Sequence, residues 1–186
     1  MRVVAGEARG RRLVAPTGRD TRPTTDRVRE SVFGALGSLD AVVDATVVDL
    51  FAGSGALGIE ALSRGAAHCT FVEPDRAARA AVEANLAATG LGDRATVVPT
   101  TAQRWLARHG GGTSTGPGLD LALLDPPYAF DGWHDLLTEL PVVLAVIESD
   151  RPVEVPPAWE VVRQRRYGST LVVFAQRGQP SSPEPL

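Results

Sequence analysis

The feature that most constrains the fold is a short apolar segment that runs directly into a glycine-rich turn. Residues 46–50 predict a buried strand, and Gly53, Gly55 and Gly58 after it match the G-x-G-x-x-G spacing of nucleotide-binding loops. Residues 55–64 predict the helix that follows the loop. A strand, a glycine loop and a helix in this order are typical of α/β folds that bind a nucleotide-containing ligand at the loop.

The rest of the chain alternates between apolar runs of strand length and runs with helical periodicity. This alternation predicts an α/β fold, a parallel sheet with helices on both faces. The expected strands are residues 46–50, 70–73, 95–98, 119–124 and 142–148, and the expected helices are residues 55–64, 75–89 and 101–108. Residues 159–164 and 170–176 predict two more strands, joined near Gly168. Pro141 leaves a shorter link than expected before the strand at residue 142.

The two ends of the chain differ from this body. Residues 1–13 have apolar ends around a polar, glycine-containing stretch, which predicts a short β-hairpin. A helix is expected from Thr25 to about Gly37, with Thr24 or Thr25 as its N-cap, and residues 110–118 predict a flexible loop. We expect an N-terminal extension over residues 1–22, one domain over residues 23–178 and an unstructured tail over residues 179–186.

Composition limits the class of protein. The 186 residues are enough for one domain, and 44% hydrophobic and 22% charged residues are ordinary for a globular protein. The longest apolar run, residues 142–147, is too short to span a bilayer, and the N-terminal arginines stand where a signal peptide needs apolar residues. The single cysteine, Cys69, predicts a buried strand residue. We expect a cytoplasmic monomer that binds no membrane and no metal.

Charge is distributed unevenly along the chain. Residues 1–30 carry eight arginines and four acids, whereas residues 31–186 carry eleven arginines and eighteen acids. Lysine is absent, so every basic side chain is an arginine, whose planar guanidinium pairs well with phosphate oxygens. A basic segment on an acidic body suits a polyanionic partner, but a solvated arginine-rich arm explains the charge equally well.

Two acids next to the glycine loop narrow the choice of ligand. Asp49 directly precedes the turn, where it would repel the pyrophosphate of a dinucleotide but attract the ammonium and sulfonium groups of S-adenosylmethionine. Glu73 closes the second strand, at the position of ribose-binding acids in α/β folds. The structural alternatives are that Asp49 caps the turn and that Glu73 is an acid at a helix N-terminus. The pattern favours S-adenosylmethionine, with S-adenosylhomocysteine as the product.

A second motif, Asp125-Pro126-Pro127-Tyr128, follows the predicted strand over residues 119–124. The two prolines lack N–H donors and fix the backbone, so the carbonyls keep defined directions. Asp125 and the Pro126 carbonyl can each accept a hydrogen bond from an exocyclic amine, and Tyr128 offers a face on which a base can stack. The alternative is a proline loop that simply ends a strand, with Tyr128 in the core.

Four segments together resemble one protein family. They are residues 6–13, 21–33, 49–60 and 125–128, of which the Arg-Pro-Thr-Thr-Asp-Arg-Val-Arg-Glu run over residues 22–30 is the most specific. Over nearly its whole length the chain resembles the RsmD family, the bacterial 16S ribosomal RNA guanine-N2 methyltransferases. The resemblance implies a class I, Rossmann-like methyltransferase fold whose seven-stranded, mostly parallel sheet ends in an antiparallel edge. It also implies a small N-terminal β-hairpin that helps to hold RNA.

The resemblance also implies roles for individual residues. The cofactor is expected to contact Asp49, Phe51, Gly53, Ser54, Gly55, Leu57, Glu73, Pro74, Thr101 and Ala102. The target guanine is expected at Asp125, Pro126 and Tyr128. The 16S rRNA, naked or in a partly assembled small subunit, is expected to contact Arg9, Arg11, Arg12, Arg22, Thr24 and Arg27. Helix capping and surface ion pairs are the alternative roles of Thr24, Arg27 and Glu30.

Three other functions stay open at this point. An adenine-N6 nucleic-acid methyltransferase uses the same Asp-Pro-Pro-Tyr chemistry, but 186 residues leave no room for a separate DNA-recognition domain. A non-catalytic rRNA-binding assembly factor is disfavoured by the intact motif at Asp125, and a nicotinamide oxidoreductase is disfavoured by Asp49. Residues 100–103 lack the acid that holds adenine in many class I methyltransferases, so backbone, hydroxyl or amide groups are expected to do so.

Overall fold

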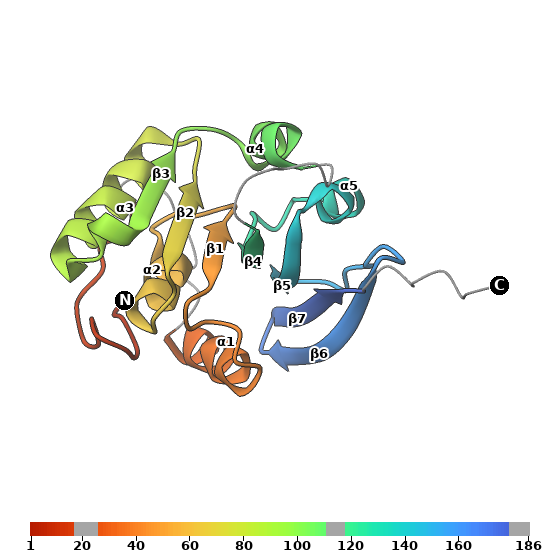
Figure 1. Ribbon diagram of the computed structural model, residues 1–186, viewed down its shortest axis with the longest axis horizontal. Helices are drawn as coiled ribbons and strands as arrows, with labels where there is room; N and C mark the ends of the chain where they lie inside the picture. Colours follow the sequence, from red (N-terminus) through yellow and green to blue (C-terminus); the bar gives the residue numbers. More distant parts are fainter. Residues whose placement is uncertain (17–25, 111–117, 179–186) are drawn as a thin grey trace.

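The computed structural model, which describes residues 1–16, 26–110 and 118–178, contains a seven-stranded sheet with helices on both faces (Figure 1). The strands lie in the order β3-β2-β1-β4-β5-β7-β6, and β7 runs opposite to the other six, so its pairings with β5 and β6 are antiparallel. The strands are β1 (Thr46–Asp49), β2 (His68–Val72), β3 (Ala95–Val98), β4 (Leu119–Leu124), β5 (Val142–Ser149), β6 (Trp159–Tyr167) and β7 (Thr170–Arg177). The helices are α1 (Asp26–Ser38), α2 (Ala56–Ser63), α3 (Arg76–Thr89), α4 (Ala102–His109), α5 (Trp133–Glu139) and the 3-10 turn η1 (Gly92–Arg94).

The core is divided between the two faces of the sheet. Successive strand residues point to opposite faces, so Val47 packs with α1, α2 and α3 while its neighbour Val48 packs with α4 and α5. Because both faces are covered, the central strands are almost continuously apolar, as the sequence pattern predicts. Cys69 is fully buried on β2, which confirms its expected structural role.

Gly58 sets the distance between α2 and the sheet. A Cβ atom at this position would lie 2.4 Å from the Phe71 ring and 2.7 Å from the Cys69 Sγ atom, both on β2. Only glycine therefore permits this close helix–strand contact, which is the packing role of the third glycine in nucleotide-binding loops. The contact fixes where α2 begins and hence where the glycine loop lies.

The N-terminal segment turns back on itself as the predicted hairpin over residues 1–13, with one antiparallel bridge, between Arg2 and Arg12. Backbone hydrogen bonds join its two arms, because the Val3 N–H donates to the Arg11 carbonyl at 3.0 Å and the Gly10 N–H donates to the Val3 carbonyl at 2.9 Å. The residues between the arms bind α2. The Val4 and Ala5 N–H groups donate to Glu60, and the Ala8 N–H donates to the Ser63 hydroxyl at 3.0 Å. The predicted hairpin is therefore present, and the residues at its tip are held against α2.

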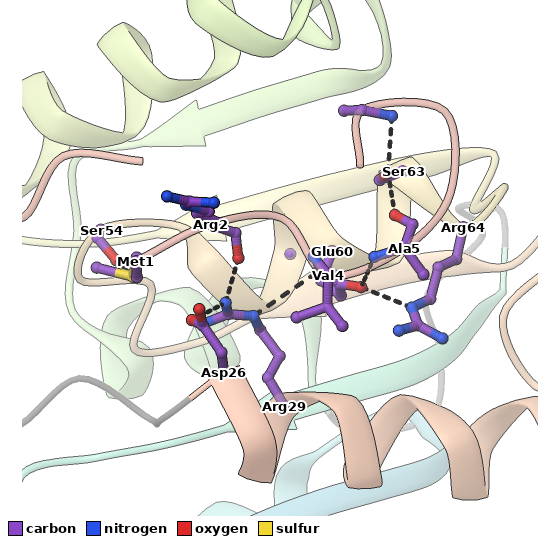
Figure 2. A network of polar contacts seen from close by, with 12 residues as sticks. Met1, Arg2, Val4, Ala5, Asp26, Arg29, Ser54, Glu60, Ser63 and Arg64 are labelled. Atoms are coloured by element: carbon purple, nitrogen blue, oxygen red, sulfur yellow. Dashed lines mark hydrogen bonds and ion pairs between the residues drawn. The ribbon is translucent and has the colours of Figure 1, made fainter. Parts of the chain in front are cut away.

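A buried ion pair joins α1 and α2 beneath this segment (Figure 2). Arg29 and Glu60 are both fully buried, with the Arg29 Nε atom 3.6 Å from a Glu60 oxygen. Glu60 also accepts from Val4 N at 2.7 Å and Ala5 N at 3.0 Å, and Arg29 donates to the Arg2 carbonyl. These contacts tie three segments of the chain together.

The predicted element bounds agree with the structure to within a few residues. The second strand begins earlier than expected, at His68, and ends before Glu73. The short link at Pro141 is real: α5 ends at Glu139 because the residue before a proline is driven out of helical geometry, and Leu140 is extended. The expected N-cap at Thr24 or Thr25, most of the loop at residues 110–118 and the tail at residues 179–186 lie outside the described residues.

In the part of the chain that the structure describes, no helix has both the length and the apolar character needed to cross a bilayer.

Replacing Glu60 by Ala is expected to lower the free energy of unfolding by about 3 to 5 kcal/mol, because the buried Arg29 then loses its buried ion-pair partner and keeps the exposed Asp26, and the Val4 and Ala5 N–H groups lose their acceptor. Urea unfolding followed by tryptophan fluorescence measures the change.

The matched control is Arg64→Ala, which removes the part-exposed partner that binds Glu60 from one helical turn away. This change is expected to cost less than about 1 kcal/mol, because such i,i+4 pairs are weak. Equal destabilisation in the two variants would contradict the role given to the Arg29–Glu60 pair.

Candidate active site

A cavity of about 880 Å³ opens at the carboxyl ends of the parallel strands. In the sheet, β1 lies between β2 and β4. The chain continues from β1 to β2 on one side and forms β3 before it returns to β4 on the other side, so the loops that follow β1 and β4 lead away from each other. Open α/β sheets bind ligands in the crevice that such a divergence leaves. The volume lies within the range of about 300 to 1,000 Å³ that is usual for small-molecule sites.

The cavity brings together nearly all of the residues expected to bind the cofactor and the base. Its lining includes Asp49, Phe51, Gly53, Ser54, Leu57, Glu73, Pro74, Thr101, Ala102, Asp125, Pro126 and Tyr128. Gly55 is the exception, because it does not line the cavity. With φ at 78°, it precedes α2, and a Cβ atom there would lie 3.3 Å from Ile59, Phe71 and Val82. Its role in the structure is the turn and the packing beneath it.

Asp49 is a buried carboxylate at the end of β1. Only 1% of its surface is exposed, and its Oδ2 atom accepts a hydrogen bond from the Gly58 N–H at 3.1 Å. Its Oδ1 atom has no hydrogen-bond partner among the described residues. Burial, together with the charges of Asp125 and Glu73, raises the pKa of Asp49 to about 7. The turn-capping role therefore accounts for one oxygen and leaves the other for a ligand.

Glu73 supports the glycine loop from the end of β2. Its Oε2 atom accepts from the Gly53 N–H at 2.9 Å, and its Oε1 atom accepts from the Asp75 N–H at the same distance. Gly53 has φ at 55°, a left-handed geometry that favours glycine. Each carboxylate oxygen has a second lone pair, so Glu73 can hold the loop and still accept from a ligand hydroxyl.

Asn85 is a buried residue of α3 that the sequence analysis did not single out. Its amide nitrogen donates to the Ser54 carbonyl at 2.8 Å and to the Val14 carbonyl at 3.0 Å, and its oxygen accepts from the Val14 N–H at 2.8 Å. It thereby joins the glycine loop to the N-terminal segment. The sequence does contain a signal that Asn85 is buried, because it falls at helical spacing among the apolar residues Ala78, Val82 and Leu86.

The Asp125-Pro126-Pro127-Tyr128 motif leaves β4 on the other side of the cavity. Asp125 is partly exposed, Pro126 is buried, and Tyr128 is 49% exposed, so Tyr128 does not fill core. Arg151 holds the loop from outside, donating to the Tyr128 carbonyl at 3.0 Å and to the Phe130 carbonyl at 2.7 Å. Tyr128 thus lines the cavity while keeping an exposed aromatic face.

The structure adds residues that the motifs did not predict. Glu148 and Ser149, at the end of β5, line the cavity, as do residues 167–170 at the β6–β7 turn. The pairing of β4 with β5 ends at Leu124 and Ile147, and the next residues along the two strands are Asp125 and Glu148, so these acids lie at neighbouring strand ends. The cavity is therefore acidic on several sides, which favours a cationic ligand. Among the described residues, no group of three or more His, Cys, Asp or Glu side chains is placed to hold a metal ion.

The predicted RNA-binding residues that the structure describes do not line this cavity. Arg9, Arg11 and Arg12 are exposed on the N-terminal loop and do not line it. Arg27, exposed near the start of α1, lines a second, smaller cavity. Arg22 and Thr24 lie outside the described residues.

Comparison with known proteins agrees with this architecture. The chain is 37% identical over 190 residues to ribosomal RNA small subunit methyltransferase D of Escherichia coli, covering 95% of this chain and 90% of the relative. The solved Escherichia coli protein yhhF superimposes with a TM-score of 0.79 at 36% identity, covering 95% of this chain and 97% of that one. SMU.776, solved in complex with S-adenosylhomocysteine, shares the fold at a TM-score of 0.61 and 16% identity, covering 81% of this chain and 48% of that one.

The expected class I, Rossmann-like methyltransferase fold is thus confirmed, with its antiparallel edge formed by β7 and β6. A family profile described as "Conserved hypothetical protein 95" matches residues 1–176. The chain belongs to this family, and so to the RsmD family that its motifs resemble.

Proposed function

We propose that this protein is an S-adenosylmethionine-dependent methyltransferase that modifies the exocyclic N2 amine of a guanine in 16S ribosomal RNA. The observation that carries the proposal is the joining of the glycine loop and the Asp125–Tyr128 motif in one acidic cavity. The name of the Escherichia coli relative, ribosomal RNA small subunit methyltransferase D, supports the same assignment. The substrate is then 16S rRNA, naked or in a partly assembled subunit, which fits a cytoplasmic enzyme.

The residues that line the active-site cavity are chemically suited to bind S-adenosylmethionine. The buried Asp49 Oδ1 atom, which has no hydrogen-bond partner among the described residues, suits the ammonium group, and Phe51, Gly53 and Leu57 would surround the methionine end. Glu73 would accept from the ribose hydroxyls. The adenine would lie near Pro74, Thr101, Ala102 and Gln103, which also line the cavity. SMU.776, which shares the fold, binds S-adenosylhomocysteine and supports this choice.

The chemistry follows from the positions of Asp125, Pro126 and Tyr128. When bound, S-adenosylmethionine would supply an electrophilic methyl group, whose bond to sulfur breaks as the bond to the amine nitrogen forms, leaving the neutral thioether S-adenosylhomocysteine. Asp125 and the Pro126 carbonyl accept hydrogen bonds from the amine and draw its lone pair out of conjugation with the ring, while Tyr128 holds the base by stacking. As the N–C bond forms, the amine becomes strongly acidic, and its extra proton passes to water directly or through Asp125. No tuned general base is needed for this loss.

The proposal is tested by mass spectrometry of ribosomal RNA nucleosides from cells that lack the gene. Loss of N2-methylguanosine from the 16S rRNA, restored by the wild-type gene, is the expected result. Loss of N6-methyladenosine instead would assign the adenine activity, and an unchanged set of modified nucleosides would favour a non-catalytic assembly factor. Calorimetry with S-adenosylhomocysteine and with NAD decides the cofactor independently.

Replacing Asp125 by Ala is expected to lower kcat at least about a hundredfold, because the variant lacks an acceptor that orients the amine during transfer. The affinity for S-adenosylhomocysteine is expected to change little. Single-turnover methyl transfer and calorimetry measure the two quantities. Asp131→Ala, an exposed acid in the same loop that does not line the cavity, is the matched control and should retain activity. Unchanged turnover in the Asp125 variant would refute the proposed amine contact.

The affinity for S-adenosylhomocysteine is expected to rise with pH, by up to about tenfold per pH unit below pH 7, and to level off above it. The sign follows from the raised pKa of Asp49, about 7, which leaves the carboxyl protonated below that pH and able to attract the ammonium only above it. Calorimetry between pH 5.5 and pH 8 measures this dependence and the accompanying proton release. Asp49→Asn should bind weakly with a flat profile, and the same slope in both proteins would exclude Asp49 as the ammonium ligand.

A further inference from the structure

We propose that the second cavity binds phosphodiester groups of the RNA strand next to the target nucleotide. This inference rests on the proposed function and adds a site to it. The second cavity has a volume of about 390 Å³ and is lined by Arg27, Val28, Arg165, Arg166, Tyr167 and Gly168. Arg27 comes from α1, whereas both other arginines come from β6.

The second cavity adjoins the active-site cavity. Val28, Tyr167 and Gly168 line both of them, so they share one side. A nucleotide whose base enters the active-site cavity therefore has its backbone within reach of the second one. Phosphate contacts of this kind position a nucleic acid without reading its sequence.

The two neighbouring cavities carry opposite charge. The active-site cavity has four acids in its lining, Asp49, Glu73, Asp125 and Glu148, whereas three of the six residues that line the second cavity are arginines and none is an acid. All three arginine side chains are exposed, and no carboxylate of the described residues lies within ion-pair distance of them. This separation of charge suits a nucleotide, because its exocyclic amine donates hydrogen bonds to acceptors and its phosphate oxygens pair with arginine guanidinium groups.

The elements that form the second cavity are held in fixed positions. The Tyr167 hydroxyl is hydrogen-bonded to the Ser31 hydroxyl, which ties the end of β6 to α1. Tyr167 pairs with Thr170 across a two-residue turn, in which Gly168 has φ at 59°. The Arg165 guanidinium lies 5.7 Å from the centre of the Tyr167 ring. The arginines thus project from a braced hairpin and helix, which lowers the entropy cost of binding a phosphate.

The test is fluorescence anisotropy with deproteinised 16S rRNA from cells that lack the gene, at several salt concentrations. The variant carries Arg165→Gln and Arg166→Gln, and its dissociation constant for the RNA is expected to rise at least about tenfold. The slope of log affinity against log salt should fall by about 0.7 to 0.9 for each phosphate that the variant no longer neutralises. Methyl transfer should show a raised KM with kcat unchanged, and the affinity for S-adenosylhomocysteine should stay the same.

The matched control carries Arg104→Gln and Arg108→Gln, two exposed arginines of α4 that line neither cavity. It removes the same charge and is expected to bind RNA as the wild type does. Wild-type affinity in the β6 variant, or equal weakening in both variants, would overturn the inference while leaving the proposed function intact. Displacement of the RNA by millimolar inorganic phosphate at constant ionic strength would also overturn it, because the site would then take free phosphate. A wild-type protein that binds RNA but transfers no methyl group would defeat the proposed function alone.

Discussion

The buried ion pair between Arg29 and Glu60 holds together the segments that surround both cavities. Two buried charges are stable only when each is paired, so α1, α2 and the N-terminal segment are stabilised in one arrangement. Glu60 lies on the helix that starts at the glycine loop, and the segment it binds carries Met1 into the lining of the active-site cavity. Arg29 similarly places α1, whose Val28 lies between the two cavities. The Arg29–Glu60 pair lines neither cavity, and its role is to hold in place the elements that line them.

The active-site cavity combines buried acids with rigid backbone. Acids lie at the carboxyl ends of β1, β2, β4 and β5. Burial raises the pKa of Asp49, and the charges of Asp125 and Glu73 raise it further. Such an arrangement is costly in the free protein and becomes favourable when a cation neutralises it. The glycine loop and the Pro126–Pro127 turn follow the neighbouring strands β1 and β4, and both line this cavity. The arginines of the second cavity lie beyond the residues that the two cavities share.

Much of the fold could be predicted because its signals are local. The apolar run before Gly53 and the alternation that follows predict the parallel strands and their helices with small errors at the ends. The contact between the N-terminal hairpin and α2 was the exception. The two arms of the hairpin pair with each other, as the apolar pattern suggests, whereas Glu60 and Ser63, more than fifty residues away, bind the backbone between the arms. A local pattern contains no information about such a distant partner.

The sequence by itself determined the α/β class, the glycine loop and the Asp125–Tyr128 motif, because each depends on residues close together in the chain. Only the tertiary structure decided that Asn85 joins the loop to the N-terminal segment, that Glu148 lines the same cavity as Asp125, and that Arg27 lines one cavity with Arg165 and Arg166. These neighbours come from elements far apart in sequence, and strand order, register and helix packing bring them together. The order β1-β4-β5-β7 in space, unlike the order along the chain, places the β6–β7 turn next to α1, and no periodicity in the sequence encodes that contact.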